Sequence, residues 1–300
     1  MPKILLCERH ISEETPRRLV EAGFEVFSPK EEIPGVHEFD RSALIQTIKD
    51  LQPDILLTGF RHTIDEEILS LSPIKAVFTR TTGTDHITGK VEIIKLVGEE
   101  LTDVVAVPEL CLWAMLELLR RRGGQELKGK TLGVIGYGRI GQILAKYGAF
   151  LGMSVIFNDP HKYSKSLFTA KYIDEYGEVE ESEELTPHKQ TLDELLKVSD
   201  IVSLNISSTE ENRGFFDKAK FDLMKQGSYF LNSARPWLVD NLALKENLES
   251  GKLAGAWVDF DLGFTAENLI QTNHIGGKTL ESSIKTEEII VNKILQWSKS

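Results

Sequence analysis

The feature that most constrains this chain is a glycine-rich run, TLGVIGYGRIG, at residues 131–141. The run begins as an apolar, strand-like stretch. Its last residues begin a helix-like pattern that covers residues 139–151. In such a unit the first glycine permits a tight turn, the second lets a pyrophosphate approach the backbone, and the third lets the helix pack on the strand. The positive N-terminus of the helix can then hold the phosphates. The run therefore predicts a dinucleotide-binding loop at Gly136, Gly138 and Gly141; a glycine-rich turn that serves packing alone is the alternative.

An acidic residue after the next strand-like stretch bears on which cofactor binds. The stretch Met153–Asn158 is followed by Asp159, whose carboxylate would accept hydrogen bonds from ribose hydroxyls and repel a 2′-phosphate. NAD is therefore favoured over NADP, and Lys162 is a nearby cation that weakens this preference. We expect Arg139 and Ile140, within the glycine loop, to contact the cofactor as well.

Composition, charge and cysteine use exclude several classes of protein. The 300 residues suggest about two domains of ordinary size. The net charge of −11 argues against nucleic acid or an anionic membrane as a partner, because either needs a clustered basic surface. Cys7 and Cys111 lie far apart in apolar runs, which indicates two reduced, buried thiols rather than a disulfide or a metal site. No stretch resembles a signal peptide or a membrane span, so we expect a cytoplasmic protein.

Strand-like and helix-like runs alternate along the chain, which predicts the α/β class with two doubly wound parallel sheets. We expect residues 1–103 with 279–300 to form one domain and residues 104–278 the other. Helical apolar spacing over Pro108–Arg122 predicts a helix that bridges them, and the amphipathic run Leu280–Trp297 should pack back on the first domain. The expected strands lie at residues 3–7, 24–27, 54–58, 75–79, 200–204, 228–232, 254–259 and 268–271, and other helices at 13–22, 41–51, 192–198, 218–224 and 241–250.

One segment interrupts this alternation. Between His161 and Gln190, residues 174–184 (DEYGEVEESEE) gather many carboxylates in a short space. Charge runs of this kind are usually solvated insertions. A role in binding a basic partner is the alternative.

Taken together, several motifs give the chain a resemblance to one family over most of its length. The sequence resembles the D-isomer-specific 2-hydroxyacid dehydrogenases. The resemblance implies a Rossmann NAD-binding domain and a flavodoxin-like substrate domain built from the two chain ends. It also implies hydride transfer between NAD(H) and a small 2-hydroxy or 2-keto acid, in the cleft between the domains and with D specificity. The matching motifs are RTTGTDHI at residues 80–87, Pro108-Glu109, residues 129–141, LNSARPWLVD at 231–240, GAWVD at 255–259 and HIGG at 274–277.

The resemblance also assigns roles to individual residues. Arg235 would hold the substrate carboxylate and carbonyl oxygen with its fork of donors, and His274 would act as general acid in reduction and as base in oxidation. Backbone amides of Thr82 and Gly83 would complete the carboxylate site, and Asp259 would orient the nicotinamide carboxamide. The remaining expected cofactor contacts are Ser207, Asn212, Ser233, Ala234 and Gly276, together with His274.

The chain departs from the family at the partner of the catalytic histidine. The family has a glutamate five residues past the aspartate that matches Asp259, and this chain has Phe264 there. The segment that follows is also shortened. Asp261 and Glu267 are the two acidic residues that could stand in. Without a carboxylate partner the pKa of His274 should lie near or below the free value of about 6.5, so we expect reductase activity to weaken as the pH rises through neutrality.

Two further departures concern the backbone and the assembly. Pro236 stands where the family usually has glycine, and it should push Arg235 towards an extended conformation. Ser207 replaces a family proline in the adenine-side loop. The link from Arg122 to Gly129 lacks much of the arm with which family members embrace a second subunit, so whether the chain is a homodimer stays open.

Three functions are compatible with these departures. An NAD-dependent 2-hydroxyacid dehydrogenase is the leading interpretation, and an NAD(H)-binding regulatory protein with a degenerate active site is the alternative. An altered enzyme whose substrate brings its own acid is the third. The particular acid stays open: a phosphorylated or dicarboxylate substrate would need further cations, for which Arg9, Arg61 and His62 are positional guesses, while His10 and His86 fit loop or capping positions.

Overall fold

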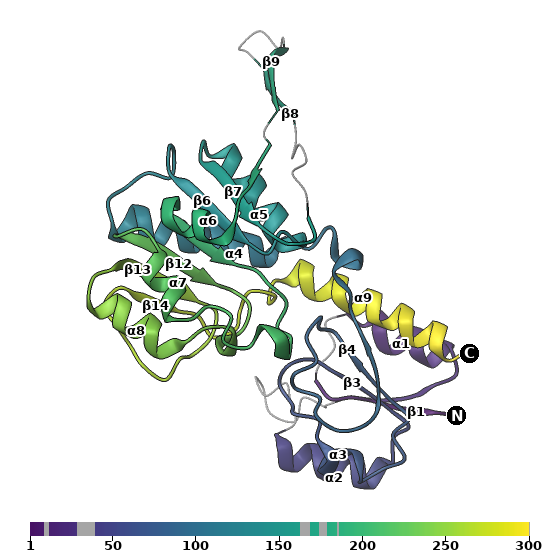
Figure 1. Cartoon of the computed structure of the whole chain (residues 1–300). Helices are drawn as coiled ribbons and strands as arrows, with labels where there is room; N and C mark the ends of the chain where they lie inside the picture. Colours follow the sequence, from purple (N-terminus) through teal and green to yellow (C-terminus); the bar gives the residue numbers. More distant parts are fainter. Residues whose placement is uncertain (9–11, 29–39, 163–168, 174–178, 185, 300) are drawn as a thin grey trace. The chain divides into compact units, whose positions relative to one another are not determined.

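The chain forms two compact units, shown in Figure 1. The computed structural model describes residues 1–8, 12–28, 40–162, 169–173, 179–184 and 186–299, and for residues 169–173 and 179–184 the backbone alone. Unit 1 comprises Met1–Val104 and Thr279–Ser300, and unit 2 comprises Val105–Lys278. Arg9 and His10 lie outside the described residues. Within the described part, no helix is long and apolar enough to cross a membrane.

Unit 1 is built around a five-stranded parallel sheet in the order β2-β1-β3-β4-β5. This is the doubly wound order typical of flavodoxin-like domains, with a switch point between β1 and β3. Buried residues of α1 and α9 cover one face of the sheet, and those of α2 and α3 cover the other. The elements are β1 (Lys3–Leu6), α1 (Glu14–Glu21), β2 (Glu25–Phe27), α2 (Arg41–Leu51), β3 (Ile55–Thr58), α3 (Glu66–Leu69), β4 (Ala76–Thr79), β5 (Glu92–Lys95), a 3₁₀ turn (Gly98–Leu101) and α9 (Leu280–Trp297).

The last helix, α9, returns to the unit that contains the N-terminus. Ile290, Val291 and Ile294 are buried in the core of unit 1, and Trp297 meets Phe78 edge-on with ring centroids 5.9 Å apart. Figure 1 shows α9 lying beside α1. The prediction that the final amphipathic run packs back on the first domain is confirmed.

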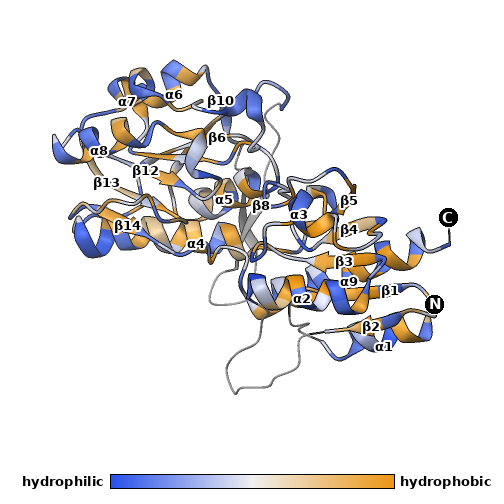
Figure 2. Ribbon diagram, turned by 90° about the horizontal axis from the view of Figure 1, so that it is seen from below, coloured by the Kyte–Doolittle hydropathy of each residue, from blue (hydrophilic) through white to orange (hydrophobic). Residues whose placement is uncertain are grey.

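Unit 2 is built around a seven-stranded parallel sheet in the order β10-β7-β6-β11-β12-β13-β14. One face is covered by α6, α7 and α8 and the other by α4 and α5. In Figure 2 the strands of both units are largely hydrophobic, as expected for parallel strands buried on both faces. The elements are α4 (Ala106–Met115), β6 (Thr131–Ile135), α5 (Arg139–Phe150), β7 (Ser154–Asn158), β10 (His188–Lys189), α6 (Leu192–Val198), β11 (Ile201–Leu204), α7 (Lys218–Leu223), β12 (Ser228–Asn232), α8 (Asn241–Glu249), β13 (Leu253–Val258) and β14 (Leu269–Gln271). Two parallel-sheet α/β units confirm the predicted fold class.

Several local features differ from the sequence prediction. The expected single helix over 108–122 is an α-helix to Met115 that continues as a π-helix, Leu116–Arg122. Strands β5 and β10 and helix α3 were not predicted. Between His161 and Gln190, β8 (Thr169–Ile173) and β9 (Val179–Glu184) pair antiparallel with each other, whereas no strand was predicted in this part of the chain. Carboxylate-rich runs have low strand propensity, so this pairing carries no clear sequence signal.

Both cysteines are buried and free, as predicted. Burial raises the pKa of the Cys111 thiol to about 12 and also raises that of Cys7. A thiol held in its protonated form is a poor nucleophile and a poor metal ligand. Among the described residues, no group of three or more His, Cys, Asp or Glu side chains could hold a metal ion.

Candidate active site

The predicted residues of unit 2 lie at one edge of its sheet. Each follows the carboxyl end of a strand, where parallel α/β sheets bind their ligands. The glycine loop follows β6, Asp159 follows β7, the segment with Ser207 and Asn212 follows β11, Ser233 to Arg235 follow β12, Asp259 follows β13, and His274 and Gly276 follow β14. Six consecutive strands of one sheet therefore bring these residues to the same edge.

The three glycines of the loop have distinct geometries. Gly136 has φ +87°, and a Cβ there would lie 2.7 Å from the carbonyl oxygen of Asn205. A Cβ on Gly141 would collide with the carbonyl oxygen of Gly136, so this glycine permits the close contact of α5 with the turn. A Cβ on Gly138 would have no atom within 4 Å, which leaves open space at the N-cap of α5. These geometries fit a turn, a packing contact and a backbone open to a pyrophosphate.

Asp159 lies directly beside this loop. Its Oδ2 accepts a hydrogen bond from the backbone N–H of Tyr137 at 2.8 Å, and its Oδ1 accepts one from His161 N–H at 2.8 Å. The Tyr137 ring anchors the loop in the core of unit 2, because it is buried and stacks on Phe157 with ring centroids 4.0 Å apart. The same burial raises the pKa of the Tyr137 hydroxyl to about 12. The residues at this edge thus fit an NAD-type cofactor, with a carboxylate next to open helix N–H groups.

The switch point of the sheet lies between β6 and β11, because the chain adds β7 on one side of β6 and then adds β11 on the other side. Asn205, just past β11, donates its N–H to the carbonyl oxygen of Ile135 at 2.7 Å. Further along, Asn212 Nδ2 donates to the Ser207 carbonyl oxygen at 2.8 Å, which closes the segment on itself. The start of this segment, at Asn205 and Ile206, therefore borders the glycine loop at Gly136.

Arg235 lies in a turn that a buried asparagine shapes. The amide of Asn232 donates to the Arg235 carbonyl oxygen at 3.0 Å and accepts from Ala234 N–H at 2.9 Å. The backbone of Arg235 is extended, with φ −146° and ψ 148°, which confirms the effect predicted for Pro236. Its guanidinium donates to the Ala234 carbonyl oxygen at 2.9 Å and lies 5.9 Å from the Trp237 ring centroid. The sequence reasoning missed Asn232, although an asparagine that ends an apolar strand is a detectable signal.

His274 has a left-handed backbone, with φ +51°. Such a conformation costs energy in a residue with a side chain and recurs at functional sites. Asp259 holds the loop around it. Its Oδ1 accepts from Thr272 Oγ1 at 2.7 Å and from Ile275 N–H at 2.8 Å, and its Oδ2 accepts from Gly276 N–H at 2.7 Å. Gly276 is needed here, since a Cβ would lie 2.7 Å from that same carboxylate oxygen.

These bonds give Asp259 a structural role besides the expected one. The resemblance implied that this carboxylate orients the nicotinamide carboxamide. In the structure Asp259 is buried and accepts three hydrogen bonds from the segment that contains His274. A carboxylate can accept about four, so Asp259 shapes the histidine loop and keeps acceptor capacity for one further hydrogen bond.

The substrate-loop residues of unit 1 follow the carboxyl end of β4. Thr82 is exposed and Gly83 is half-buried. The loop is held by its neighbour Thr81, whose hydroxyl donates to the Gly83 carbonyl oxygen at 2.6 Å and lies 2.8 Å from the Thr79 hydroxyl. His86 closes the loop, with Nε2 3.3 Å from the Thr79 hydroxyl and its ring against Phe60. His62 is buried in the loop after β3.

Comparisons with known proteins identify this arrangement. A family model for the NAD-binding domain of the D-isomer-specific 2-hydroxyacid dehydrogenases matches residues 113–276. The chain belongs to this family. Glycerate dehydrogenase of Hyphomicrobium methylovorum is 34% identical over 245 residues, which cover 73% of this chain and 71% of the relative. Glyoxylate reductase of Thermococcus onnurineus is 28% identical over 334 residues, covering 99% and 92%.

A solved structure agrees in fold. The NAD⁺-bound 3-phosphoglycerate dehydrogenase of Entamoeba histolytica superposes with a TM-score of 0.78 at 22% identity, covering 100% of this chain and 96% of that one. Family membership confirms the predicted enzyme class, an NAD-dependent dehydrogenase, and the predicted cofactor.

In this dehydrogenase, Phe264 occupies the position of the expected glutamate. The Phe264 ring packs against the hydrophobic cluster beneath α7 and α8, and Lys245 Nζ lies 5.8 Å from its centroid. Gln271 holds this segment, because its side chain accepts from Leu262 N–H at 2.7 Å and donates to the Phe264 carbonyl oxygen at 2.8 Å. Asp261 is exposed and accepts from Gly263 N–H at 2.8 Å.

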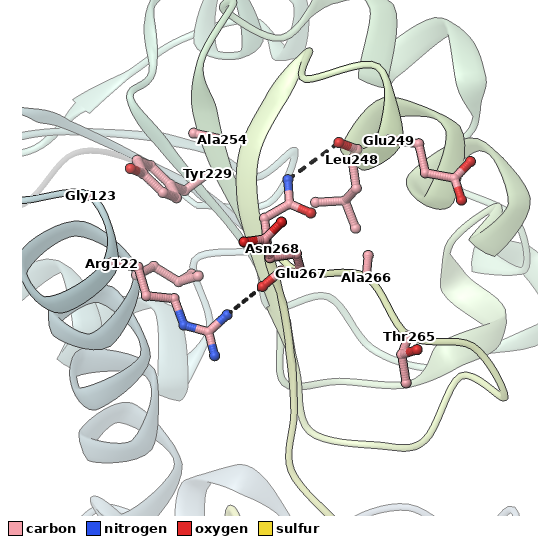
Figure 3. Close-up of a pocket in the computed structure, with 11 residues that line it drawn as sticks. Arg122, Gly123, Tyr229, Leu248, Glu249, Ala254, Thr265, Ala266, Glu267 and Asn268 are labelled. Carbon is pink, nitrogen blue, oxygen red and sulfur yellow. Dashed lines mark hydrogen bonds between the residues drawn. The ribbon is translucent and has the colours of Figure 1, made fainter.

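Glu267 is at the wrong edge of the sheet to replace the glutamate. It precedes β14, whereas His274 follows it, so the two residues lie at opposite ends of the strand. Its carbonyl oxygen accepts from Arg122 Nη1 at 2.9 Å. Glu267 lines a cavity of about 820 Å³, shown in Figure 3. Tyr229 and Ala254, near the starts of β12 and β13, line the same cavity. None of the residues predicted to bind the cofactor or the substrate lines this cavity.

The dehydrogenase variant Phe264→Glu should therefore not gain keto-acid turnover. The introduced carboxylate would lose the apolar contact, and its attraction to Lys245 would offset only part of that loss, so the free energy of unfolding should fall by about 1–3 kcal/mol. Phe264→Leu, the matched control, keeps the apolar contact and should lose less than about 1.5 kcal/mol. Denaturant unfolding and NADH oxidation test both variants. A gain in turnover by Phe264→Glu alone would contradict this assignment.

Proposed function

We propose that this dehydrogenase reduces a small 2-keto acid to the D-2-hydroxy acid with NADH, and catalyses the reverse oxidation with NAD⁺. The observation that carries the proposal is the grouping at one sheet edge. The glycine loop, Arg235 and His274 follow strands of the same parallel sheet. β12 and β14 are separated by β13 alone, so their carboxyl ends are about 10 Å apart. That spacing suits two side chains acting on one small acid.

Reduction of the carbonyl needs a cation and an acid at the substrate. The fork of donors on Arg235 would bind the carboxylate and polarise the carbonyl oxygen. The protonated imidazole of His274 would donate its proton to that oxygen as the alkoxide forms, and in oxidation the neutral ring would take the proton back. Backbone N–H groups of Thr82 and Gly83 are proposed to bind the substrate carboxylate as well. NADH supplies the hydride.

The remaining assignments concern the cofactor. Gly136, Gly138, Arg139, Ile140 and Gly141 would form the pyrophosphate loop at the N-terminus of α5, and Asp159 would bind the ribose hydroxyls. The open space at Gly138 and the carboxylate beside Tyr137 N–H support this assignment. Ser207, Asn212, Ser233, Ala234, Asp259, His274 and Gly276 are proposed to line the rest of the cofactor site.

A panel of acids tests the proposal. We expect purified protein to oxidise NADH with at least one of glyoxylate, pyruvate, hydroxypyruvate, phenylpyruvate, oxaloacetate or 2-ketoglutarate, followed at 340 nm. Between pH 6 and pH 8 the reduction rate should fall and the oxidation rate should rise, because reduction uses the protonated imidazole and oxidation the neutral one. Opposite or absent trends, with chemistry limiting, would remove His274 from the acid–base role.

The second candidate function is an NAD(H)-binding regulatory protein. The environment of Phe264 favours it, since an apolar ring against Lys245 occupies the position of the expected glutamate. This candidate predicts NADH binding in calorimetry with no turnover on any acid of the panel. The same two measurements therefore separate the candidates.

A further inference from the structure

Unit 1 contains a buried ion-pair network that joins three distant parts of the chain. Arg80 Nη2 donates to Glu8 Oε2 at 2.7 Å, and Arg80 Nη1 donates to Glu287 Oε2 at 3.2 Å. Glu8 is 8% exposed, Glu287 is 1% exposed, and the Arg80 side chain is 17% exposed. Burying three charges is expensive unless each is paired and hydrogen-bonded. Such a network therefore calls for an explanation beyond stability.

One end of the network joins β1 to the loop after β3. Glu8, just past β1, accepts from Gly59 N–H at 2.9 Å and from Arg61 N–H at 3.3 Å with its Oε1. The fit is close, since a Cβ on Gly59 would lie 2.5 Å from Glu8 Oε2. Glycine at this position thus allows the carboxylate to lie against the backbone.

The other end of the network is on α9. Glu287 Oε1 accepts from the Thr15 hydroxyl at 2.5 Å and from Ser12 N–H at 3.3 Å. Arg18 adds a second bond between α1 and α9, from Nη2 to Asn292 Oδ1 at 2.6 Å. Glu287 is therefore a fixed anchor for the second arm of the guanidinium.

Between these ends, Arg80 is the first residue after β4 and begins the loop that contains Thr82 and Gly83. Its backbone N–H donates to the Thr58 carbonyl oxygen at 3.0 Å, which ties the start of the loop to the end of β3. Both arms of its guanidinium are engaged by glutamates. The side chain thus holds the loop from within the unit.

We propose that Arg80 is a positioning residue for the substrate loop, held by Glu8 and Glu287 so that the Thr82 and Gly83 amides keep the geometry that binds a carboxylate. The inference rests on the proposed function for the role of those amides. A planar fork suits the task, because it spans two carboxylates in fixed directions, which an ammonium cannot do. Small misplacements of a binding group cost large factors in turnover.

Arg80→Lys tests the proposal, because it keeps the charge and removes the fork. We expect the KM for the preferred keto acid to rise by about 10- to 100-fold, while the Kd for NADH, measured by calorimetry, changes less than about twofold. The backbone N–H groups of residue 80 and Ile87, which donate to the Thr58 and Thr84 carbonyl oxygens at the two ends of the loop, should exchange hydrogen about tenfold faster, since the loop opens more often. The matched control is Arg17→Lys, a residue of the same unit that pairs with Glu14 and Glu21 on the exposed face of α1. It should leave all three quantities unchanged.

A second variant, Glu287→Gln, keeps the shape and removes one charge of the network. It should raise the KM and the exchange rate in the same direction by a smaller factor, and it decides the question if Arg80→Lys does not fold. Wild-type KM and wild-type exchange in a folded Arg80→Lys protein would overturn the proposal. If the wild-type protein shows no turnover, the proposed function fails instead, and the exchange of the two amides still decides whether Arg80 holds the loop.

Discussion

His274→Ala should abolish keto-acid reduction and retain most of the NADH affinity, although His274 is one of the residues proposed to line the cofactor site. Loss of a general acid–base group costs about 10²- to 10⁴-fold in kcat. The glycine loop and Asp159, which we propose to hold the cofactor, follow β6 and β7 rather than β14. Single-turnover and steady-state NADH oxidation measure the first effect, and calorimetry measures the second.

His188→Ala is the matched control for this variant. His188 lies in unit 2 on the edge strand β10 and is exposed, so its removal should leave kcat unchanged. Retention of turnover within about tenfold in His274→Ala would place the acid elsewhere. Loss of NADH binding in the same variant would show that the loop, rather than the proton transfer, was disturbed.

Gly138→Ala and Gly141→Ala should separate cofactor binding from folding. A Cβ on Gly138 meets no atom within 4 Å, and its φ of −75° and ψ of −163° are accessible to alanine. This variant should keep the thermal stability of the wild type and lose at least about tenfold in NADH affinity, because the methyl group occupies the space of the pyrophosphate. In Gly141→Ala the Cβ collides with the Gly136 carbonyl oxygen, and overpacking should cost about 1–3 kcal/mol of stability.

Calorimetry with NADH and thermal unfolding measure the two effects on the same samples. Wild-type NADH affinity in Gly138→Ala would mean that the phosphates bind elsewhere. Unchanged stability in Gly141→Ala would mean that α5 does not depend on its contact with the turn.

The fold was largely predictable because its signals are local. Helix α2 and helix α9 begin and end where the apolar periodicity predicts. The extended backbone of Arg235 follows from the proline after it, through a steric effect between neighbouring residues. The switch from α- to π-helix after Met115 was not predictable, because both helices place similar residues on the buried face.

The placement of the candidate residues at one sheet edge was predictable, whereas their individual contacts were less so. Motif residues at the ends of strands could be assigned to one sheet edge, since parallel strands all end on the same side. The role of Asp259 could not be predicted, because its carboxylate accepts hydrogen bonds from the Thr272 hydroxyl and from two backbone N–H groups further along the chain. Likewise, no pattern in the sequence indicated that Phe264 packs against Lys245 and the cluster under α8.

By itself, the sequence determined the α/β class, the dinucleotide loop with its three distinct glycines, and the return of α9 to the first unit. Periodicity and steric limits act over a few residues and can be read without knowing the fold. Only the tertiary structure decided that Arg80 joins Glu8, 72 residues away, to Glu287, 207 residues away, and that Asp259 shapes the loop of His274. These bonds depend on burial and on distances between side chains, which exist only once the sheets have assembled.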